Sequence, residues 1–112
     1  MERLKSMIIL MKLISIKPST RKQKRYVAEF CECNGESKCK SNERKRTHFG
    51  FKGGSTFIDN NDDTKKSAYI ARHKVNENWN DRTSAGALAR YILWNKKTLQ
   101  ESIADFKKRF KC

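Results

Sequence analysis

The densest group of reactive side chains in this sequence lies in the stretch IARHKVNENWN, residues 70–80. Histidine, glutamate and asparagine are residue types found in general-base and nuclease sites. A metal site here would need further ligands, which His48 and the carboxylates Asp59, Asp62 and Asp63 could supply. The spacing argues against both kinds of site, because the histidines are far apart and no cysteine or serine nucleophile is paired with a base.

The same stretch is typical of a structural corner. Asn76, Asn78 and Asn80 are residues that turn the chain and satisfy the free carbonyl groups at a helix end, and Trp79 would fill the corner. We therefore predict that the stretch stabilises the fold. We expect that the chain is not an enzyme and that it has no catalytic residues, no cofactor and no small-molecule substrate.

The cysteines are Cys31, Cys33, Cys39 and Cys112, of which the first three follow the pattern C-x-C-x5-C. Three thiolates and the imidazole of His48 could bind zinc. The C-x-C spacing is tighter than that of the usual zinc knuckle, so no bound metal is expected. A local disulfide is a second possibility, and free thiols in a reducing compartment are the interpretation that the sequence favours.

The glycine-rich stretch FGFKGGSTF, residues 49–57, has the composition of a phosphate-binding loop. It lacks the glycine-lysine-serine order of such loops and the helix that should follow them directly. We interpret it as a turn between two strands.

The charge of the chain is its most informative property. Its net charge is +14, from 26 lysines and arginines against 12 acidic residues. This exceeds the roughly 2–8 charges that solubility requires, and it favours binding to nucleic acid, an anionic membrane face or an acidic protein surface. No apolar run approaches the ~20 residues that would span a bilayer.

Three basic clusters are expected to form the interaction surface. No aromatic signature of RNA readout accompanies them, so the expected contact is with phosphates or acidic surfaces and not with particular bases. The clusters are Arg21, Lys22, Lys24 and Arg25; Arg44, Lys45 and Arg46; and Lys107, Lys108, Arg109 and Lys111.

The first half of the chain has the alternating pattern of strands. KLISI (12–16) would place Leu13 and Ser15 on one face and Ile14 and Ile16 on the other. RYVAEFCEC (25–33) would place Tyr26, Ala28 and Phe30 on one face, before a hairpin turn at Asn34-Gly35. THFGF (47–51) would place Thr47, Phe49 and Phe51 opposite His48, and FKGGSTFIDN could add a short fourth strand.

The second half has the spacing of helices. Carboxylates in NNDD (60–63) would cap a helix from Thr64 to Val75, with Ala68, Ala71 and Val75 on one stripe. Thr83 or Ser84 would cap a second helix that buries Leu88, Tyr91 and Ile92. Thr98 and Glu101 form a capping box for a third, which buries Leu99, Ile103, Phe106 and Phe110.

These patterns predict an α+β fold, with an N-terminal antiparallel meander of three to four strands followed by three short helices. We expect a leader at residues 1–10 and one domain at 11–112, with strands in 11–58 and helices in 59–112. Either Met1 or Met11 could be the start of the chain.

Several segments resemble a family of small, basic, uncharacterised proteins of giant nucleocytoplasmic DNA viruses that infect algae and amoebae. They are MKLISIKPST, HFGFKGG, YIARHKVNENWN, TSAGALARYILWNKKTL and SIADFKKRF. The cysteine-rich stretch CECNGESKCKSNERKR departs from the family pattern and is longer. The motif residues to which the resemblance assigns a structural role are His48, Gly50, Gly53, Arg72, His73, Glu77, Asn78, Trp79 and Trp94.

The resemblance implies a fold and a viral origin without an activity. Together with the charge, it predicts a minor capsid or virion structural protein that cements neighbouring capsid proteins through a basic surface. The alternative is a nucleic-acid-binding protein that packages DNA or binds RNA. The expected location is the virion, with the host cytoplasm or virus factory during assembly, and an anionic inner membrane is a further possible partner.

Overall fold

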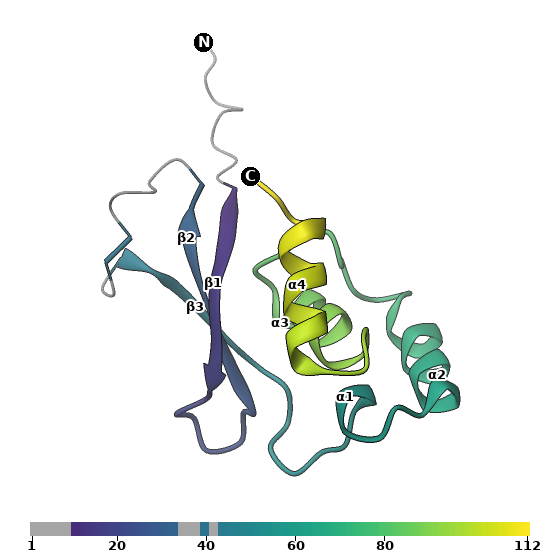
Figure 1. The fold of residues 1–112 in the computed structure, drawn as a ribbon. Coiled ribbons are helices and arrows are strands. Elements are labelled where there is room, and N and C mark those ends of the chain that lie inside the picture. Colours follow the sequence, from purple (N-terminus) through teal and green to yellow (C-terminus); the bar gives the residue numbers. More distant parts are fainter. Residues whose placement is uncertain (1–9, 34–38, 41–42) are drawn as a thin grey trace.

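The computed structural model describes residues 10–33, 39–40 and 43–112. Residues 1–9 of the expected leader and the expected turn at Asn34-Gly35 lie outside the described residues. In the described part, a three-stranded antiparallel sheet is followed by helices that lie on one side of it (Figure 1). The predicted α+β fold is confirmed.

The sheet consists of β1 (Met11–Pro18), β2 (Tyr26–Glu32) and β3 (Lys45–Phe49), with β2 in the centre. Tyr26 pairs with Phe49 and Ala28 with Thr47 across the β2–β3 ladder. Ala28 and Phe30 are fully buried against the helices. The alternation predicted for β2 is therefore confirmed, and Glu29 faces the opposite side.

The alternation predicted for β1 is wrong because the strand contains an irregularity. Leu13 pairs with Phe30 and Ser15 with Glu29, so the register shifts between Leu13 and Ser15. An extra residue in one strand changes the face on which later side chains lie. Leu13 and Ile16 consequently both pack in the core, whereas Ser15 contacts Glu29 on the other face.

The helical part contains five short segments in the described residues: α1 (Phe57–Asn60), α2 (Asp63–His73), α3 (Ala85–Leu88), the π-helix η4 (Ala89–Leu93) and α4 (Leu99–Arg109). The possible fourth strand is not formed at residues 57–60. Helix α1 occupies this position, because Thr56 and Asp59 form a capping box that starts a helix. The helices therefore begin before the expected boundary at residue 58.

The predicted helix caps are confirmed at Asp62, Ser84 and Thr98, whose side chains each accept a backbone N–H of the following turn. The predicted stripe on α2 is wrong. Ala68, Ala71 and Val75 are exposed, and the helix ends at His73 and buries Tyr69 instead. The cause is a tertiary contact, because α2 packs against Trp94 through the ring of Tyr69.

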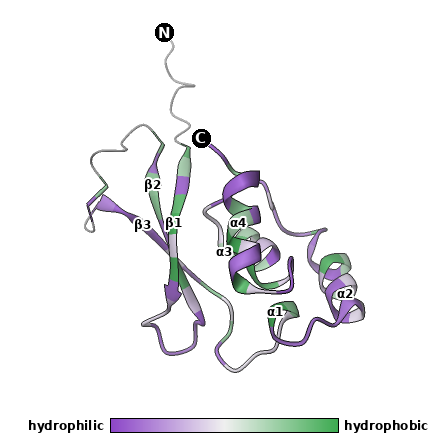
Figure 2. Cartoon of the chain, in the orientation of Figure 1, coloured by the Kyte–Doolittle hydropathy of each residue, from purple (hydrophilic) through white to green (hydrophobic). Residues whose placement is uncertain are grey.

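The core lies between the sheet and the α3–η4–α4 region. Its buried members are Leu13, Ala28, Phe30, Phe49, Leu88, Ile92, Leu93 and Phe106. Helix α4 buries Ser102 and Phe106, and much of its ribbon is coloured as hydrophilic (Figure 2). Phe51, expected beside Phe49, is 64% exposed, because β3 ends at Phe49 and Gly50 turns the chain with a positive φ of 80°.

Within the described residues, none of the helices combines the length and apolar character that crossing a bilayer requires.

Candidate functional site

The sheet face turned away from the helices is built around Glu29. This residue lies opposite Ser15 on β1 and Arg46 on β3. Although its carboxylate is charged, Glu29 is only 5% exposed. A buried carboxylate requires partners that replace the water it has lost.

Those partners come from both neighbouring strands and from the segment that precedes β3. Ser15 Oγ donates to the carboxylate at 3.0 Å, Arg44 at 2.8 Å and Arg46 Nε at 2.9 Å, while Lys17 Nζ lies 3.4 Å away. Burial by itself raises the pKa of Glu29, but the bonds from Arg46, Ser15, Arg44 and Lys17 outweigh it and lower the pKa to about 2. The carboxylate is thus ionised and surrounded by positive groups.

The face therefore remains basic despite its central carboxylate. Lys17, Arg44 and Arg46 all contact the Glu29 carboxylate, and the Lys17 side chain is more than half exposed. This arrangement can attract an anion to the outer side of the sheet.

His48 lies on the same face, at the end of the sheet near the β1–β2 loop. Its Nδ1 is hydrogen-bonded to Ser19 Oγ at 2.7 Å. Burial lowers the pKa of His48, and the positive charges of Arg21 and Lys24 lower it further. Because a neutral histidine adds no charge, the positive charge at this end of the sheet comes from the lysines and arginines of the β1–β2 loop.

The cysteines are paired with one another. Cys31 forms a disulfide with Cys39, and Cys33 forms one with Cys112. The expectation of free thiols is therefore wrong. The end of β2 lies close enough to the C-terminus for a disulfide between residues that are 79 positions apart in the sequence. The zinc alternative loses its thiolates, and no cluster of three or more metal-ligating side chains is present in the part of the chain that the structure describes.

The three basic clusters lie at three places. Arg21, Lys22 and Lys24 are exposed in the β1–β2 loop, whereas Arg25 is partly buried by an ion pair. Arg44 and Arg46 contact Glu29 at the other end of the sheet, and Lys45 is exposed. The last cluster, residues 107–111, ends α4 on the helical side, where Arg109 contacts Asp105.

The stretch 70–80 forms a compact set of polar contacts after α2. His73 Nδ1 and Glu77 Oε2 are hydrogen-bonded at 2.8 Å, and Trp79 Nε1 donates to Glu77 Oε1 at 2.8 Å. Asn78 Oδ1 accepts the Asn80 backbone N–H at 3.0 Å. Both carboxylate oxygens of Glu77 are occupied by neighbours within the stretch, which suits a structural use of that side chain.

His73 also belongs to a stack of rings. Its ring lies on Tyr69 with centroids 4.2 Å apart, and Tyr69 lies on Trp94 at 4.6 Å with an angle of 7° between the planes. Burial raises the pKa of Tyr69 to about 12, so its hydroxyl keeps its proton at neutral pH. The stack joins α2 to the end of η4.

These aromatic residues line a groove of about 510 Å³. One wall is formed by α2 and the stretch after it, and another by the small residues Ala85, Gly86 and Ala89. Leu93 and Trp94 contribute from the end of η4, Gln23 and Lys24 from the β1–β2 loop, and Gly50, Phe51, Ser55 and Thr56 from the loop after β3. Gly86 permits this packing, because a Cβ there would lie 3.0 Å from Glu77 Oε1.

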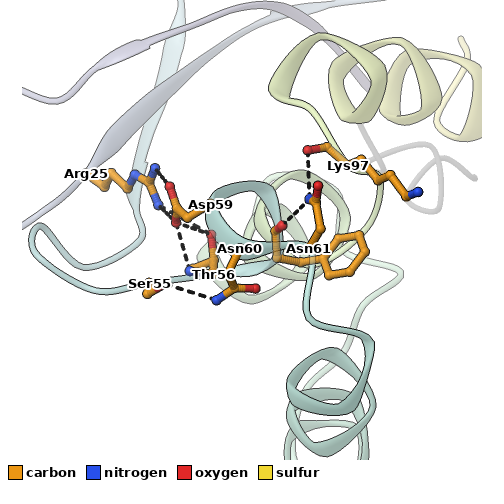
Figure 3. Close-up of polar contacts among 8 residues, drawn as sticks. Arg25, Ser55, Thr56, Asp59, Asn60, Asn61 and Lys97 are labelled. Carbon is orange, nitrogen blue, oxygen red and sulfur yellow. Dashed lines mark hydrogen bonds and ion pairs between the residues drawn. The ribbon is translucent and has the colours of Figure 1, made fainter.

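The ion pair of Arg25 and Asp59 connects the two loops that line the groove. The guanidinium donates to both carboxylate oxygens, at 2.7 and 2.6 Å (Figure 3). Asp59 in turn accepts the Thr56 backbone N–H at 2.8 Å, and its pKa is lowered to about 2, chiefly by the bond from Arg25. On the other side of α1, Asn61 donates to the Lys97 carbonyl at 3.2 Å (Figure 3).

Of the other motif residues, Arg72 is exposed on α2, and Gly53 has a φ of 95°. Asp59 was considered in the sequence only as a possible metal ligand, and the structure pairs it with Arg25 instead. Neither Glu29 nor Tyr69 was singled out. Glu29 had one detectable signal, which is an acidic residue at the centre of an otherwise hydrophobic strand flanked by basic segments.

A model of a protein family whose description is "Family of unknown function (DUF5754)" matches residues 14–73. The match begins within β1 and runs to the end of α2, so it includes most of the sheet, the Arg25–Asp59 pair and part of the ring stack. No curated protein and no solved structure matches the chain. Because the match covers more than half of the residues, the chain belongs to the DUF5754 family.

Proposed function

We propose that this chain is a non-enzymatic structural protein of a viral particle, a minor capsid or virion protein that attaches to neighbouring capsid proteins through a basic surface. The single observation that carries the proposal is the outer face of the sheet. Its central carboxylate, Glu29, is already surrounded by Lys17, Arg44 and Arg46, and the exposed side chain of Lys17 leaves positive charge at the surface for an acidic partner.

Two further observations support this proposal. The helices leave that face of the sheet uncovered (Figure 1). The disulfides Cys31–Cys39 and Cys33–Cys112 suit a protein that functions in a particle outside the reducing cytosol. The viral setting itself rests on the resemblance of the sequence segments.

A second function, nucleic-acid binding, is favoured by the size and spread of the charge. A net charge of +14 with clusters at both ends of the sheet and on α4 suits a polyanion that can contact several places at once. Basic clusters of this kind suit contact with phosphates and not with particular bases, so we expect any such binding to be independent of sequence.

Charge-reversal variants test which surface is used. We expect Arg21→Glu with Lys22→Glu, at the end of the outer sheet face, to reduce attachment to DNA-free shells of the virus that encodes the chain by at least tenfold. The matched control, Lys107→Glu with Lys108→Glu on α4, changes the net charge equally and should keep most of the attachment. Equal loss in both variants would contradict a defined interface, and failure of the wild-type protein to co-sediment with the shells would contradict the capsid proposal.

A salt series separates the two functions. Gel shifts with duplex DNA between low and physiological salt measure how many phosphates the protein contacts. Tight binding that falls steeply with salt, without attachment to DNA-free shells, would favour the nucleic-acid function.

A further inference from the structure

We propose that the groove between α2, η4 and the two loops binds one nucleotide unit, with the base against the aromatic side chains and the phosphate at Lys24. The groove shares the β1–β2 loop with one end of the outer sheet face, but its other lining residues come from the helices and from the loop after β3. The proposal does not depend on the attachment proposed above. Its volume of about 510 Å³ lies within the roughly 300–1,000 Å³ of small-ligand pockets.

The first argument is an exposed aromatic side chain at the groove. Phe51 is 64% exposed, whereas the other aromatic residues of the described chain are buried or half-buried. It lies in a loop with glycines at positions 50, 53 and 54, and Gly53 has open space around it. An aromatic ring that is exposed and lines a cavity provides a face on which a planar base can stack.

The second argument concerns polar groups without partners. Within the described residues, the side chains of Gln23, Lys24 and Tyr69 and the Nε2 atom of His73 make no hydrogen bond, although all of these residues line the groove. An amide, a hydroxyl and an imidazole can each bond to the edge of a base or to a sugar hydroxyl, and an ammonium group binds phosphate.

The third argument is the sign of the charge. Glu77 keeps its negative charge, but both of its oxygens are bonded within its own segment, to His73 and to Trp79. Lys24 is the remaining formal charge of the lining, and the whole chain carries +14. An anionic ligand with a flat apolar part therefore fits the groove better than a cation.

One wall of the groove has short side chains at Ala85 and Ala89, whereas the Glu77 carboxylate packs against Gly86. Ala85 and Ala89 present methyl groups, and the π-helix that begins at Ala89 lies beside them. Local π-helical geometry is frequent at binding sites, because it widens the helix and shifts the side chains around it.

A base with its phosphate could be a free nucleotide or one unit of a single-stranded nucleic acid. Titrations with each kind of ligand distinguish the two. The probes are adenosine monophosphate and a ten-residue oligodeoxyadenylate, with inorganic polyphosphate as a probe that has charge but no base. Trp94 lines the groove, and Trp79 contacts Glu77 of its lining, so tryptophan fluorescence reports binding.

We expect Phe51→Ala to weaken binding of the oligonucleotide at least about fivefold, since stacking contributes substantially per base, and to leave polyphosphate binding unchanged. Val75→Ala is the matched control, because Val75 is 73% exposed but does not line the groove. Lys24→Gln should weaken binding of both nucleotide probes.

Binding of adenosine monophosphate that depends on Phe51 would identify a free nucleotide as a sufficient ligand, and dependence seen only with the oligonucleotide would identify a strand. The proposal is overturned if Phe51→Ala behaves as Val75→Ala does with both probes, or if neither probe binds. Phe51→Ala separates this outcome from failure of the sheet-face proposal, because β3 ends at Phe49 and the variant should keep its attachment to DNA-free shells.

Discussion

Glu29 shows at the level of one residue how the sheet tolerates an acidic side chain in its central strand. The carboxylate replaces its lost water with bonds from Ser15, Arg44 and Arg46. Removing the carboxylate would lower the stability by more than these ion pairs contribute to it, because the arginines would then lack a partner in a partly buried site.

We predict that Glu29→Gln lowers the free energy of unfolding at pH 7 by about 2–3 kcal/mol. The pKa of Glu29 falls from its usual 4.5 to about 2 in the folded protein. The unfolded chain therefore takes up the proton first as the pH falls, so the contribution is complete above pH 4.5 and is lost between there and about 2.

Urea unfolding at pH 7 and at pH 3 measures this contribution. The difference in stability between wild type and Glu29→Gln should shrink at the lower pH. Glu32→Gln is the matched control, since Glu32 ends β2 in an exposed position and should change the stability little. A pH-independent difference for Glu29→Gln would contradict the proposed role of its charge.

At the level of elements, Arg25 determines how the start of β2 and helix α1 lie relative to one another. Its planar guanidinium reaches both oxygens of Asp59, and Asp59 also closes the capping box with Thr56. The Arg25–Asp59 pair therefore holds the start of β2 against the start of α1. It also connects the β1–β2 loop with the loop after β3, both of which line the groove.

We predict that Arg25→Lys lowers the free energy of unfolding by about 1 kcal/mol, because an ammonium group cannot form the two parallel bonds and the site is partly open to solvent. It should also broaden the amide NMR signals of residues 55–60. Arg72→Lys, on the exposed face of α2, is the control. Unchanged signals of α1 in Arg25→Lys would show that the capping box alone holds the helix.

At the level of the whole molecule, the disulfide between Cys33 and Cys112 joins the end of β2 to the end of the chain. The two cysteines are 79 residues apart in the sequence, whereas Cys31 and Cys39 are 8 apart. Closing a longer loop restricts the unfolded chain more, so the two bonds should differ in their effect on stability.

We predict that Cys33→Ser with Cys112→Ser lowers the stability by about 2–4 kcal/mol, and by more than Cys31→Ser with Cys39→Ser does. Urea unfolding with and without a reducing agent measures both. Reductant should destabilise the wild-type protein at least as much as the more harmful double variant. Equal stability of wild type and the Cys33, Cys112 variant would contradict a role for this bond in the fold.

Much of the fold could be predicted from local patterns. The alternation of Tyr26, Ala28 and Phe30 identified β2, and Asp62, Ser84 and Thr98 identified the starts of three helices. These features follow from contacts within a few residues, where the period of hydrophobic side chains and the hydrogen bonds of a cap are set by the sequence alone.

The candidate sites depend on contacts between distant segments. Glu29 gains its charge partners from β1 and from the segment around β3, and the groove unites α2 with Trp94 and two loops. The sequence by itself determined the fold class, the surplus of positive charge and most helix starts. Only the tertiary structure decided the shift in β1, the cysteine pairs and the aromatic stack, because each requires side chains far apart in the chain to meet in space.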